Sequence, residues 1–305
     1  MITCGVLITS GIYLVKSLTR IARFLGISEF SAAFIIMAFA TSIPELFVGV
    51  SSAINGNPGL SLGNIIGANI LDLTLISGVI ILSAKEIKFK SRKIGSDVYL
   101  MLASILLVII LYVIGRQLSR IDGVILLGFF SFHIYNVFKK RKKYRRGKVK
   151  NGKVQISRWL LIFLSALIGL LISANLVARL APGLALDLGL PEIMIGLFLV
   201  SIATTLPELV FGLSATKMGH KEMAVGDQTG SVVTNTTLIL GIVALIHPIE
   251  AEFMPFIISA IFMFVSAFIF VIFVKSKNKL EKYEGIGLIL VYVLFVIVEV
   301  FAGVF

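Results

Sequence analysis

The chain has 305 residues, of which 58% are apolar and only 14% are charged, and its mean hydropathy is +1.03. This composition excludes a soluble globular protein, because the apolar runs are too long and too frequent for a fold surrounded by water. The formal net charge of +12 does not indicate nucleic-acid binding, since the basic residues lie between the apolar runs. The single cysteine, Cys4, excludes an intramolecular disulfide and a metal site built from cysteines.

Apolar runs of about 20 residues can cross a bilayer as helices, and ten such runs follow one another along the chain. We therefore predict an all-α polytopic protein of the cell membrane with ten transmembrane helices. The first run is similar to the apolar region of a signal peptide, but no basic segment precedes it and no clear cleavage site follows it, so we take it as a span. The runs cover residues 2–24, 30–54, 59–83, 95–115, 121–138, 158–180, 190–216, 222–246, 253–274 and 284–304.

A basic segment separates the fifth span from the sixth. Ten of the 28 Lys and Arg residues fall in 139–153, KKRKKYRRGKVKNGK. By the positive-inside rule we expect the linker 139–157 to be cytoplasmic and both termini to lie outside. We interpret the basic segment as a solvated linker that sets the topology, with binding of an anionic lipid or a regulator as the alternative. The basic residues left on the outer side are Arg116, Arg120 and Arg179, and Lys16 is ambiguous.

The chain repeats itself with a shift of 163 residues, because FATSIPELFVG at 39–49 returns as IATTLPELVFG at 202–212. Each half holds five spans, and since five is odd the second half must enter the membrane in the opposite sense. We predict two inverted five-helix repeats, 1–138 and 158–305, joined by the linker 139–157. Inverted repeats are typical of secondary transporters, which bind their substrate near the membrane midplane between interrupted helices.

A proline precedes a glutamate inside the second span and again inside the seventh. Pro44 cannot donate a hydrogen bond to the carbonyl of Ala40, and Pro207 cannot donate one to Ala203. We expect both helices to kink there and to leave carbonyl oxygens unpaired. In hydrocarbon such oxygens are costly unless they line a polar cavity or bind a ligand, and a cation is the ligand that prefers carbonyl oxygen.

Hydroxyl groups accompany each glutamate three and four residues earlier in the helix, and so share its face. Carboxylate, hydroxyl and carbonyl oxygens are the ligands that calcium prefers, and two carboxylates neutralise its charge. An unpaired acid in a membrane costs at least ~2.5 kcal/mol, so we take these acids to be functional. The residues are Thr41, Ser42 and Glu45 in the second span and Thr204, Thr205 and Glu208 in the seventh.

A second polar stripe lies on the third and eighth spans, where residues four apart share one helix face. Glycines at 63, 67, 226 and 230 permit close approach between helices, or loosen a helix near a site. Packing does not explain an acid at mid-span, so Asp72 is expected to be functional. For Asp227, nearer a helix end, a solvated position is an equal alternative. The stripe consists of Asn64, Ala68 and Asp72, and of Asp227, Ser231 and Asn235.

The segments ATSIPE with GNIIGANILD, and ATTLPE with GDQTGSVVTN, resemble the paired alpha repeats of the cation/calcium exchanger superfamily, and most of all its sodium/calcium exchanger branch. The resemblance covers the whole chain. It implies that Glu45 and Glu208 hold calcium together with main-chain oxygens of Thr41 and Thr204. Carried over by position, the sodium ligands are Ala38, Ser42 and Ala68 in the first half and Ser201, Thr205 and Ser231 in the second, with Asp72 and Asn235 between the halves.

Three departures from the pattern that the resemblance implies involve four residues. Ala68 stands where serine is common, Asp72 and Asn235 have exchanged acid and amide, and Asp227 replaces an asparagine. Calcium needs only two of the four acids, and clustered carboxylates cannot all stay ionised unpaired. A surplus acid must therefore pair with sodium, potassium or a proton. The proton-coupled branch commonly carries an acid shortly after its GN pair, and the glycine at that place here favours the sodium branch.

We therefore expect a secondary antiporter that exchanges calcium for sodium by alternating access and needs no resident cofactor. The alternatives are the same fold coupled to protons or potassium, a channel or receptor, and an intramembrane enzyme. The enzyme has little support, because His133, His220 and His247 lie near span ends without metal-binding spacing and no GxSxG elbow is present. Small cations and the lipid bilayer are the expected partners, without nucleic acid, and we expect a monomer. Glu299 has no repeat partner and is expected to reach water near the outer end.

Overall fold

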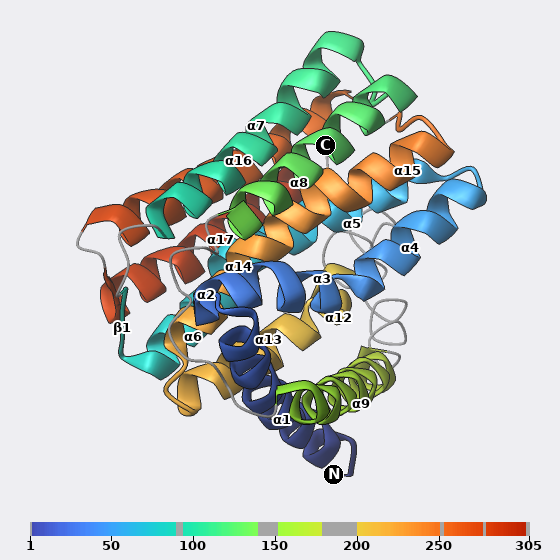
Figure 1. Ribbon diagram of the computed structural model, residues 1–305. Helices are drawn as coiled ribbons and strands as arrows, with labels where there is room; N and C mark the ends of the chain where they lie inside the picture. The colour runs from blue at the N-terminus through green and yellow to red at the C-terminus, as the bar shows by residue number, and fades with distance from the viewer. Residues whose placement is uncertain are drawn as a thin grey trace.

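The chain forms a bundle of helices in the computed structural model (Figure 1), which describes residues 2–89, 94–139, 152–178, 200–250, 253–276 and 279–302. Among these residues, seven helices are long and apolar enough to cross a membrane, or eight if the bent pair Glu29–Thr41 and Ile43–Ile54 is one span. A mostly helical, multi-pass membrane protein is therefore confirmed.

The helices follow the predicted spans in chain order. α8 lies at the predicted fifth span, whereas the described part of the seventh begins only at residue 200, and most of the linker 139–157 lies outside the described residues. The count of ten spans therefore stays a prediction. The elements are α1 (Ile2–Leu25), α2 (Glu29–Ala32), η1 (Ala33–Met37), α3 (Ala38–Thr41), α4 (Ile43–Ile54), α5 (Pro58–Leu71), η2 (Asp72–Ile76), α6 (Ser77–Ala84), β1 (Glu86–Lys88), α7 (Ile94–Gly115), α8 (Arg120–Lys139), α9 (Gly152–Ala178), α12 (Ser201–Thr204), α13 (Leu206–Lys217), α14 (Lys221–Val233), η5 (Thr234–Ile239), α15 (Leu240–Ile246), α16 (Phe253–Ser276), β2 (Lys279–Glu281) and α17 (Lys282–Ala302), where η marks a π-helical turn.

Both predicted kinks are present, each just before its proline. α3 ends at Thr41 and α4 begins at Ile43, and the chain bends by 43° between them. α12 and α13 meet in the same way, with Thr205 between them at ψ 1°. Each proline falls in the first turn of the second helix, where its missing N–H needs no intrahelical acceptor. The breaks therefore follow from the proline positions.

Matched π-helical turns interrupt the third and eighth spans, and nothing in the sequence predicted them. η2 begins at Asp72, and η5 includes Asn235, its equivalent under the 163-residue shift. A π-helical turn widens the helix by one residue and is often found at functional sites. Two of the predicted site residues of these spans, Asp72 and Asn235, therefore lie where the regular hydrogen-bond ladder is interrupted.

The two halves of the chain pack against each other through helix contacts that occur in pairs, and the two contacts of each pair are equivalent under the 163-residue shift. α14 packs on α2, η1 and α3, and α12 packs on α5; α15 packs on α8, and α17 packs on α6. Glycines make two of these contacts: a Cβ on Gly241 would lie 3.1 Å from the Gly123 carbonyl oxygen, and one on Gly78 would lie 2.8 Å from that of Gly285. Buried apolar side chains from both halves form one continuous core.

The glycines of α14 bring that helix against the backbone of the broken second span. A Cβ on Gly226 would lie 2.6 Å from the Phe30 carbonyl oxygen, and one on Gly230 would lie 2.7 Å from the Ala38 Cβ. Such distances are shorter than any normal carbon contact, so only glycine fits. The predicted close approach is confirmed for these two glycines.

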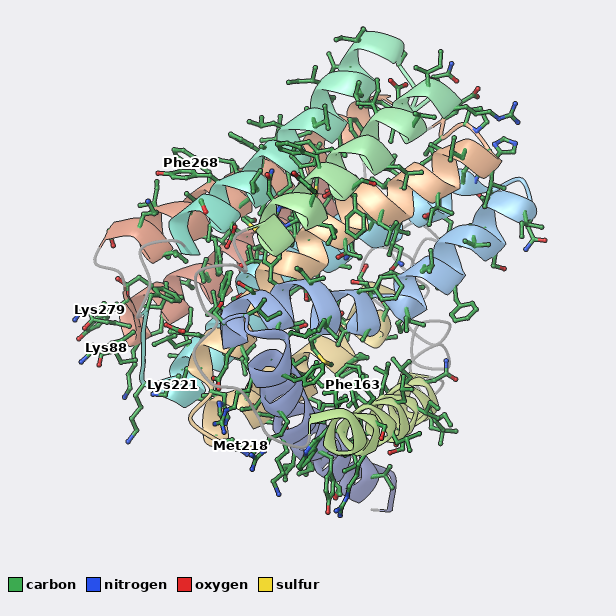
Figure 2. All side chains as sticks on the ribbon, viewed as in Figure 1. Lys88, Phe163, Met218, Lys221, Phe268 and Lys279 are labelled. Atoms are coloured by element: carbon green, nitrogen blue, oxygen red, sulfur yellow. The ribbon has the colours of Figure 1, made fainter. Side chains whose placement is uncertain are left out.

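A short ribbon joins the halves at one end of the bundle. β1 pairs with β2 in an antiparallel register that sets Ile87 opposite Leu280. The Lys279 Nζ lies 2.5 Å from the Glu281 carboxylate, and this hydrogen bond raises the pKa of Lys279. Figure 2 shows Lys88 and Lys279 close together at this ribbon. Neither strand was predicted, because three residues are too few to carry a pattern.

Candidate cation site

All the predicted site residues are buried where the two broken helices meet α5 and α14. None of them exposes more than 7% of its surface. Asp227 exposes 0%, so the alternative of a solvated acid is wrong for this residue. The physical reason is the close approach of α14 to η1 and α3, which covers the carboxylate on its helix.

Glu45 and Glu208 occupy equivalent places in the structure. Each lies in the first turn of the helix that follows a break, Glu45 in α4 and Glu208 in α13. The N–H groups of a first turn favour a carboxylate, while the last carbonyl groups of the preceding helix have no intrahelical donor. Each break thus sets an acidic side chain beside main-chain oxygens that can bind a cation.

The four acids of the site lie near one another. Glu208 is close enough to interact electrostatically with each of the other three. Glu45 lies beside Thr204, yet within the described chain neither Glu45 oxygen has a hydrogen-bond partner of normal geometry, and one oxygen each of Glu208, Asp72 and Asp227 has none. Buried carboxylate oxygens without donors are costly. A bound cation would satisfy them.

Carboxylates alone do not complete a metal site. Among the residues that the structure describes, no three His, Cys, Asp or Glu side chains converge closely enough to bind a metal ion together. A cation held here would take further ligands from hydroxyl and main-chain oxygens. That donor set suits calcium and sodium, which bind oxygen from several kinds of group.

Two threonines contact the opposite half in matched ways. The Thr41 Oγ1 lies 3.4 Å from the Asp227 Oδ1 and 3.5 Å from the Ser231 Oγ. The Thr204 Oγ1 lies 3.4 Å from the Asn64 Oδ1. Asp227 and Asn64 are equivalent under the repeat, so each threonine reaches the same position of the other half. The contact partner is an acid on one side and an amide on the other.

The remaining predicted sodium ligands differ in what they offer. The Ser201 hydroxyl donates to the main-chain oxygen of Asn64 at 3.3 Å, and the Thr205 hydroxyl donates to that of Ser201 at 2.8 Å. The Ser42 Oγ has no hydrogen-bond partner in the described ranges. Ala38 and Ala68 offer only main-chain oxygens. The structure brings these residues together, but side-chain oxygens are more numerous in the second half.

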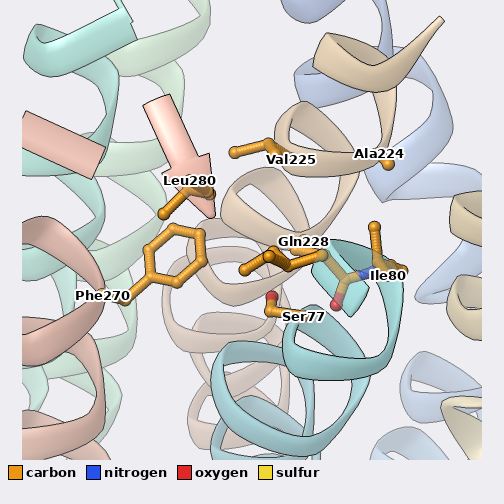
Figure 3. Close-up of a pocket in the computed structure, with 8 residues that line it drawn as sticks. Ser77, Ile80, Ala224, Val225, Gln228, Phe270 and Leu280 are labelled. Atoms are coloured by element: carbon orange, nitrogen blue, oxygen red, sulfur yellow. The ribbon is translucent and has the colours of Figure 1, made fainter. Parts of the chain in front are cut away.

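Asp72 is held by a residue that the sequence did not single out. The Gln228 amide, with its nitrogen toward Asp72, donates to the Asp72 Oδ1 at 3.2 Å and to its main-chain oxygen at 3.1 Å. The Ser77 hydroxyl donates to the same main-chain oxygen at 2.6 Å. Figure 3 shows Gln228 and Ser77 lining a narrow, largely apolar pocket with Leu280. Because Ile65 stands at the repeat position of Gln228, the repeat gave no signal for it.

Asn235 is anchored by another amide. Its Nδ2 donates to the Asn69 Oδ1 at 3.1 Å, and the Asn69 Nδ2 lies 3.5 Å from the Met263 Sδ. The Asn235 Oδ1 has no partner in the part of the chain described. No hydrogen bond joins Asn235 to Asp72 there, so the predicted acid and amide face separate partners.

The other titratable residues lie outside this site. His133 is buried on α8 with its ring 4.8 Å from that of Phe34. The His220 Nδ1 lies 2.8 Å from the Glu29 Oε2, in the turn before α14. Glu299 is partly buried and accepts a hydrogen bond of 2.6 Å from a serine of α16.

Broken helices that set buried acids and free carbonyl groups side by side are characteristic of secondary transporters. The sequence model of the family "Sodium/calcium exchanger protein" matches residues 1–139 and 158–301. The chain therefore belongs to the sodium/calcium exchanger family, as the alpha-repeat resemblance implied. Members of this family are transporters, so the expectation that the chain is not an enzyme is confirmed by its family.

Individual relatives span nearly the whole chain. It is 29% identical to the sodium/calcium exchanger MaX1 of Methanosarcina acetivorans, covering 94% of this chain and 93% of the relative. It is 26% identical to the inner membrane protein YrbG of Escherichia coli, covering 91% and 87%. A solved structure of the sodium-calcium exchanger NCX_Mj, soaked with 2.5 mM Na+ and 0.1 mM Ca2+, matches with a TM-score of 0.81 at 27% identity, covering 96% of this chain and 95% of that one.

Proposed function

We propose that the protein is a secondary antiporter that exchanges calcium for sodium by alternating access. The observation that carries this proposal is the matched pair Glu45 and Glu208, each buried in the first turn after a helix break with carboxylate oxygens that lack partners in the described chain. The family supports exchange of cations and calcium. Calcium and sodium compete for the same two carboxylates, and exchange follows from that competition.

Two inverted five-helix repeats build the transporter, and repeated contacts support this arrangement. A Cβ on Gly49 would lie 2.9 Å from the Val243 Cγ2, and one on Gly212 would lie 3.0 Å from the Ile80 Cγ1. Under the 163-residue shift these are the same contact with the halves exchanged. A two-fold relation between the halves produces such pairs, and five spans in each half make the relation inverted.

Ligands come from both repeats. In this proposal Glu45 and Glu208 hold calcium with the main-chain oxygens of Thr41 and Thr204. Sodium is held by the surrounding oxygens when calcium leaves, so that the carboxylates are never left together without a cation. The sodium ligands are Ala38, Ser42, Ala68, Ser201, Thr205, Ser231, Asp72 and Asn235, with Asn64 and Asp227 as neighbouring oxygen donors.

The transporter works as a monomer in the membrane, with the linker 139–157 in the cytoplasm and both termini outside. The positive-inside rule supports this orientation. The end of α1 and the beginning of α9 lie together, since the Arg20 guanidinium lies 5.5 Å from the centre of the Trp159 ring. Because α9 begins where the linker ends, the end of α1 lies on the same side of the membrane as the end of the linker.

A flux assay tests the exchange. Vesicles that contain the purified protein and internal sodium should take up radioactive calcium when they are diluted into sodium-free buffer. A pH gradient alone should drive no uptake, and added potassium should not be required. Protein-free vesicles and a sodium ionophore serve as controls. Calcium uptake that depends on the pH gradient but not on the sodium gradient would contradict sodium coupling and indicate that protons are the coupling ion.

Coupling to protons or potassium is the second candidate, and one observation favours it. Four buried acids surround the site, whereas calcium needs two carboxylates for neutrality. The additional acids, Asp72 and Asp227, can each bind potassium or a proton in place of sodium. The same vesicles, assayed in a potassium gradient and in a pH gradient, separate the two candidates.

The charge of Asp227 should set the apparent cation affinity. Asp227→Asn keeps an oxygen facing Thr41, as Asn64 does toward Thr204, but removes one negative charge. We expect the calcium concentration for half-maximal uptake to rise roughly 30-fold, since a charge several ångströms away is worth on the order of 2 kcal/mol.

The double variant Asn64→Asp/Asp227→Asn is the matched control for that change. It moves the acid to the equivalent position of the other half and restores the total charge. We expect its apparent calcium affinity to return toward that of the original protein. An unchanged affinity in the single variant would show that Asp227 lies too far from the cations to act on them.

A further inference from the structure

α1 and α9 form an antiparallel pair at the edge of the bundle (Figure 1). A Cβ on Gly169 of α9 would lie 2.7 Å from the Ser10 Oγ of α1. The Arg20 guanidinium of α1 lies 5.5 Å from the centre of the Trp159 ring of α9. The second contact is ten residues later on α1 and ten residues earlier on α9, so the two helices run in opposite directions. Neither helix contains an acidic residue. Every charge that this pair presents is therefore positive.

Four exposed cations form what we call the basic stripe: Lys16, Arg20 and Arg23 on α1, and Arg158 on α9. The three residues of α1 are four and three positions apart, so they share one face of the helix. None of the four makes an ion pair with any residue in the described ranges. Within the part of the chain that the structure describes, the stripe is a positive surface without a protein counter-charge.

The stripe reaches from the end of the span into the depth of the bilayer. α1 is apolar enough to cross the membrane over Gly5–Leu25, and Lys16 lies about 14 Å before Leu25 at the rise of an α-helix. A cation exposed at that depth extends toward the headgroups or draws a polar group to itself. The Lys16 ammonium lies 5.4 Å from the centre of the Tyr13 ring, and the residue is exposed.

We propose that the basic stripe binds the phosphate of an anionic phospholipid. A phosphodiester supplies the missing counter-charge, and guanidinium groups bind its oxygens in pairs. Clusters of four or more basic residues beside a membrane helix are a recurrent feature of such sites. The acyl chains would lie on the exposed apolar face of α9, which includes Leu160, Leu161 and Leu164.

A lipid at this place would act on the helix that carries Glu208. α1 packs on α13, where a Cβ on Gly11 would lie 3.1 Å from the Val210 Cγ1. Holding α1 against α9 and α13 gives the lipid control over how readily the broken helix moves. This consequence for transport rests on the proposed function, whereas lipid binding itself does not.

Native mass spectrometry of the full chain tests the binding. The protein in detergent is mixed with phosphatidylglycerol or phosphatidylcholine, and the bound lipid is counted. We expect the chain to retain phosphatidylglycerol in preference to phosphatidylcholine, and the variant Lys16→Gln/Arg20→Gln/Arg23→Gln to lose this affinity by roughly tenfold or more. Lys275→Gln is the control, because Lys275 also lies above a tyrosine ring, at 4.9 Å, but on another helix.

Equal retention of phosphatidylglycerol by the triple variant would overturn the proposal, as would equal retention of the two lipids by the unchanged chain. Competition by inorganic phosphate at the same concentration would assign the site to free phosphate instead of lipid. If the triple variant does not fold, the single variant Arg23→Gln is measured, and binding equal to that of the original chain overturns the proposal. Lipid binding is measured here without calcium flux. A failure of the lipid proposal can therefore be distinguished from a failure of the proposed function.

Discussion

Glu45→Gln and Glu208→Gln should each abolish sodium-driven calcium uptake, with a loss of roughly 100-fold or more. Each substitution keeps the size of the side chain but removes one of the two carboxylates that are proposed to bind calcium directly. Calcium then lacks full neutralisation, and an amide nitrogen replaces one oxygen ligand. The measurement is the initial rate of radioactive calcium uptake into sodium-loaded vesicles, with equal amounts of folded protein.

Glu299→Gln is the matched control for these two substitutions. Glu299 is also an acid within a long apolar helix, but it lies on α17 and is hydrogen-bonded to Ser259. Uptake by this variant should stay within about twofold of the original rate, since a hydrogen-bonded acid away from the cations contributes no ligand. Near-normal transport by both Glu45→Gln and Glu208→Gln would contradict the proposal that these glutamates form the exchange site. It would favour the alternative of a channel or receptor.

Gly230→Ala should lower stability strongly although it adds only one methyl group. The added Cβ would lie 2.7 Å from the Ala38 Cβ and would also collide with the Phe34 carbonyl oxygen, which belongs to backbone that cannot simply move aside. Overpacking of this kind costs about 1–3 kcal/mol. We expect a clear fall in the apparent melting temperature, together with a lower transport rate, because Ala38 lies next to the break.

The control for Gly230→Ala is the same substitution at Gly128. That glycine lies on α8, and a Cβ there would meet no atom within 4 Å among the described residues. Alanine is the better helix former of the two residues by ~1 kcal/mol, so Gly128→Ala should melt at the original temperature or higher. Equal melting temperatures for the two variants would show that α14 and the broken helix are not tightly packed.

The broken helices and their acids were predictable because single residues determine them. Proline lacks the backbone N–H donor at any position in a helix. The proline–glutamate pair occurs again 163 residues later, and this repetition identifies the glutamate as part of a pattern. The burial of Asp227 was not predictable, since it depends on how closely α14 approaches η1. The sequence showed that glycines allow such an approach, but not which helix makes it.

Gln228 and the π-helical turns were missed for other reasons. The equivalent of Gln228 in the first half is the apolar Ile65, so the comparison of the halves gave no reason to select it. The segments DLTLI and TNTTLI contain polar residues, but nothing in their side chains distinguishes a π-helical turn from an α-helical one. Both features arise from contacts between helices, which a one-dimensional pattern does not record.

The unequal partners of Thr41 and Thr204 have a consequence for the energy of the transport cycle. If two identical inverted repeats alternated access by exchanging their conformations, the inward-open and outward-open states would be images of each other and equal in free energy. An acid at 227 opposite an amide at 64, and an acid at 72 opposite an amide at 235, remove that degeneracy. The binding site of the cation-free transporter should therefore be open mainly to one side of the membrane. Calcium uptake and calcium release should then saturate at different ion concentrations.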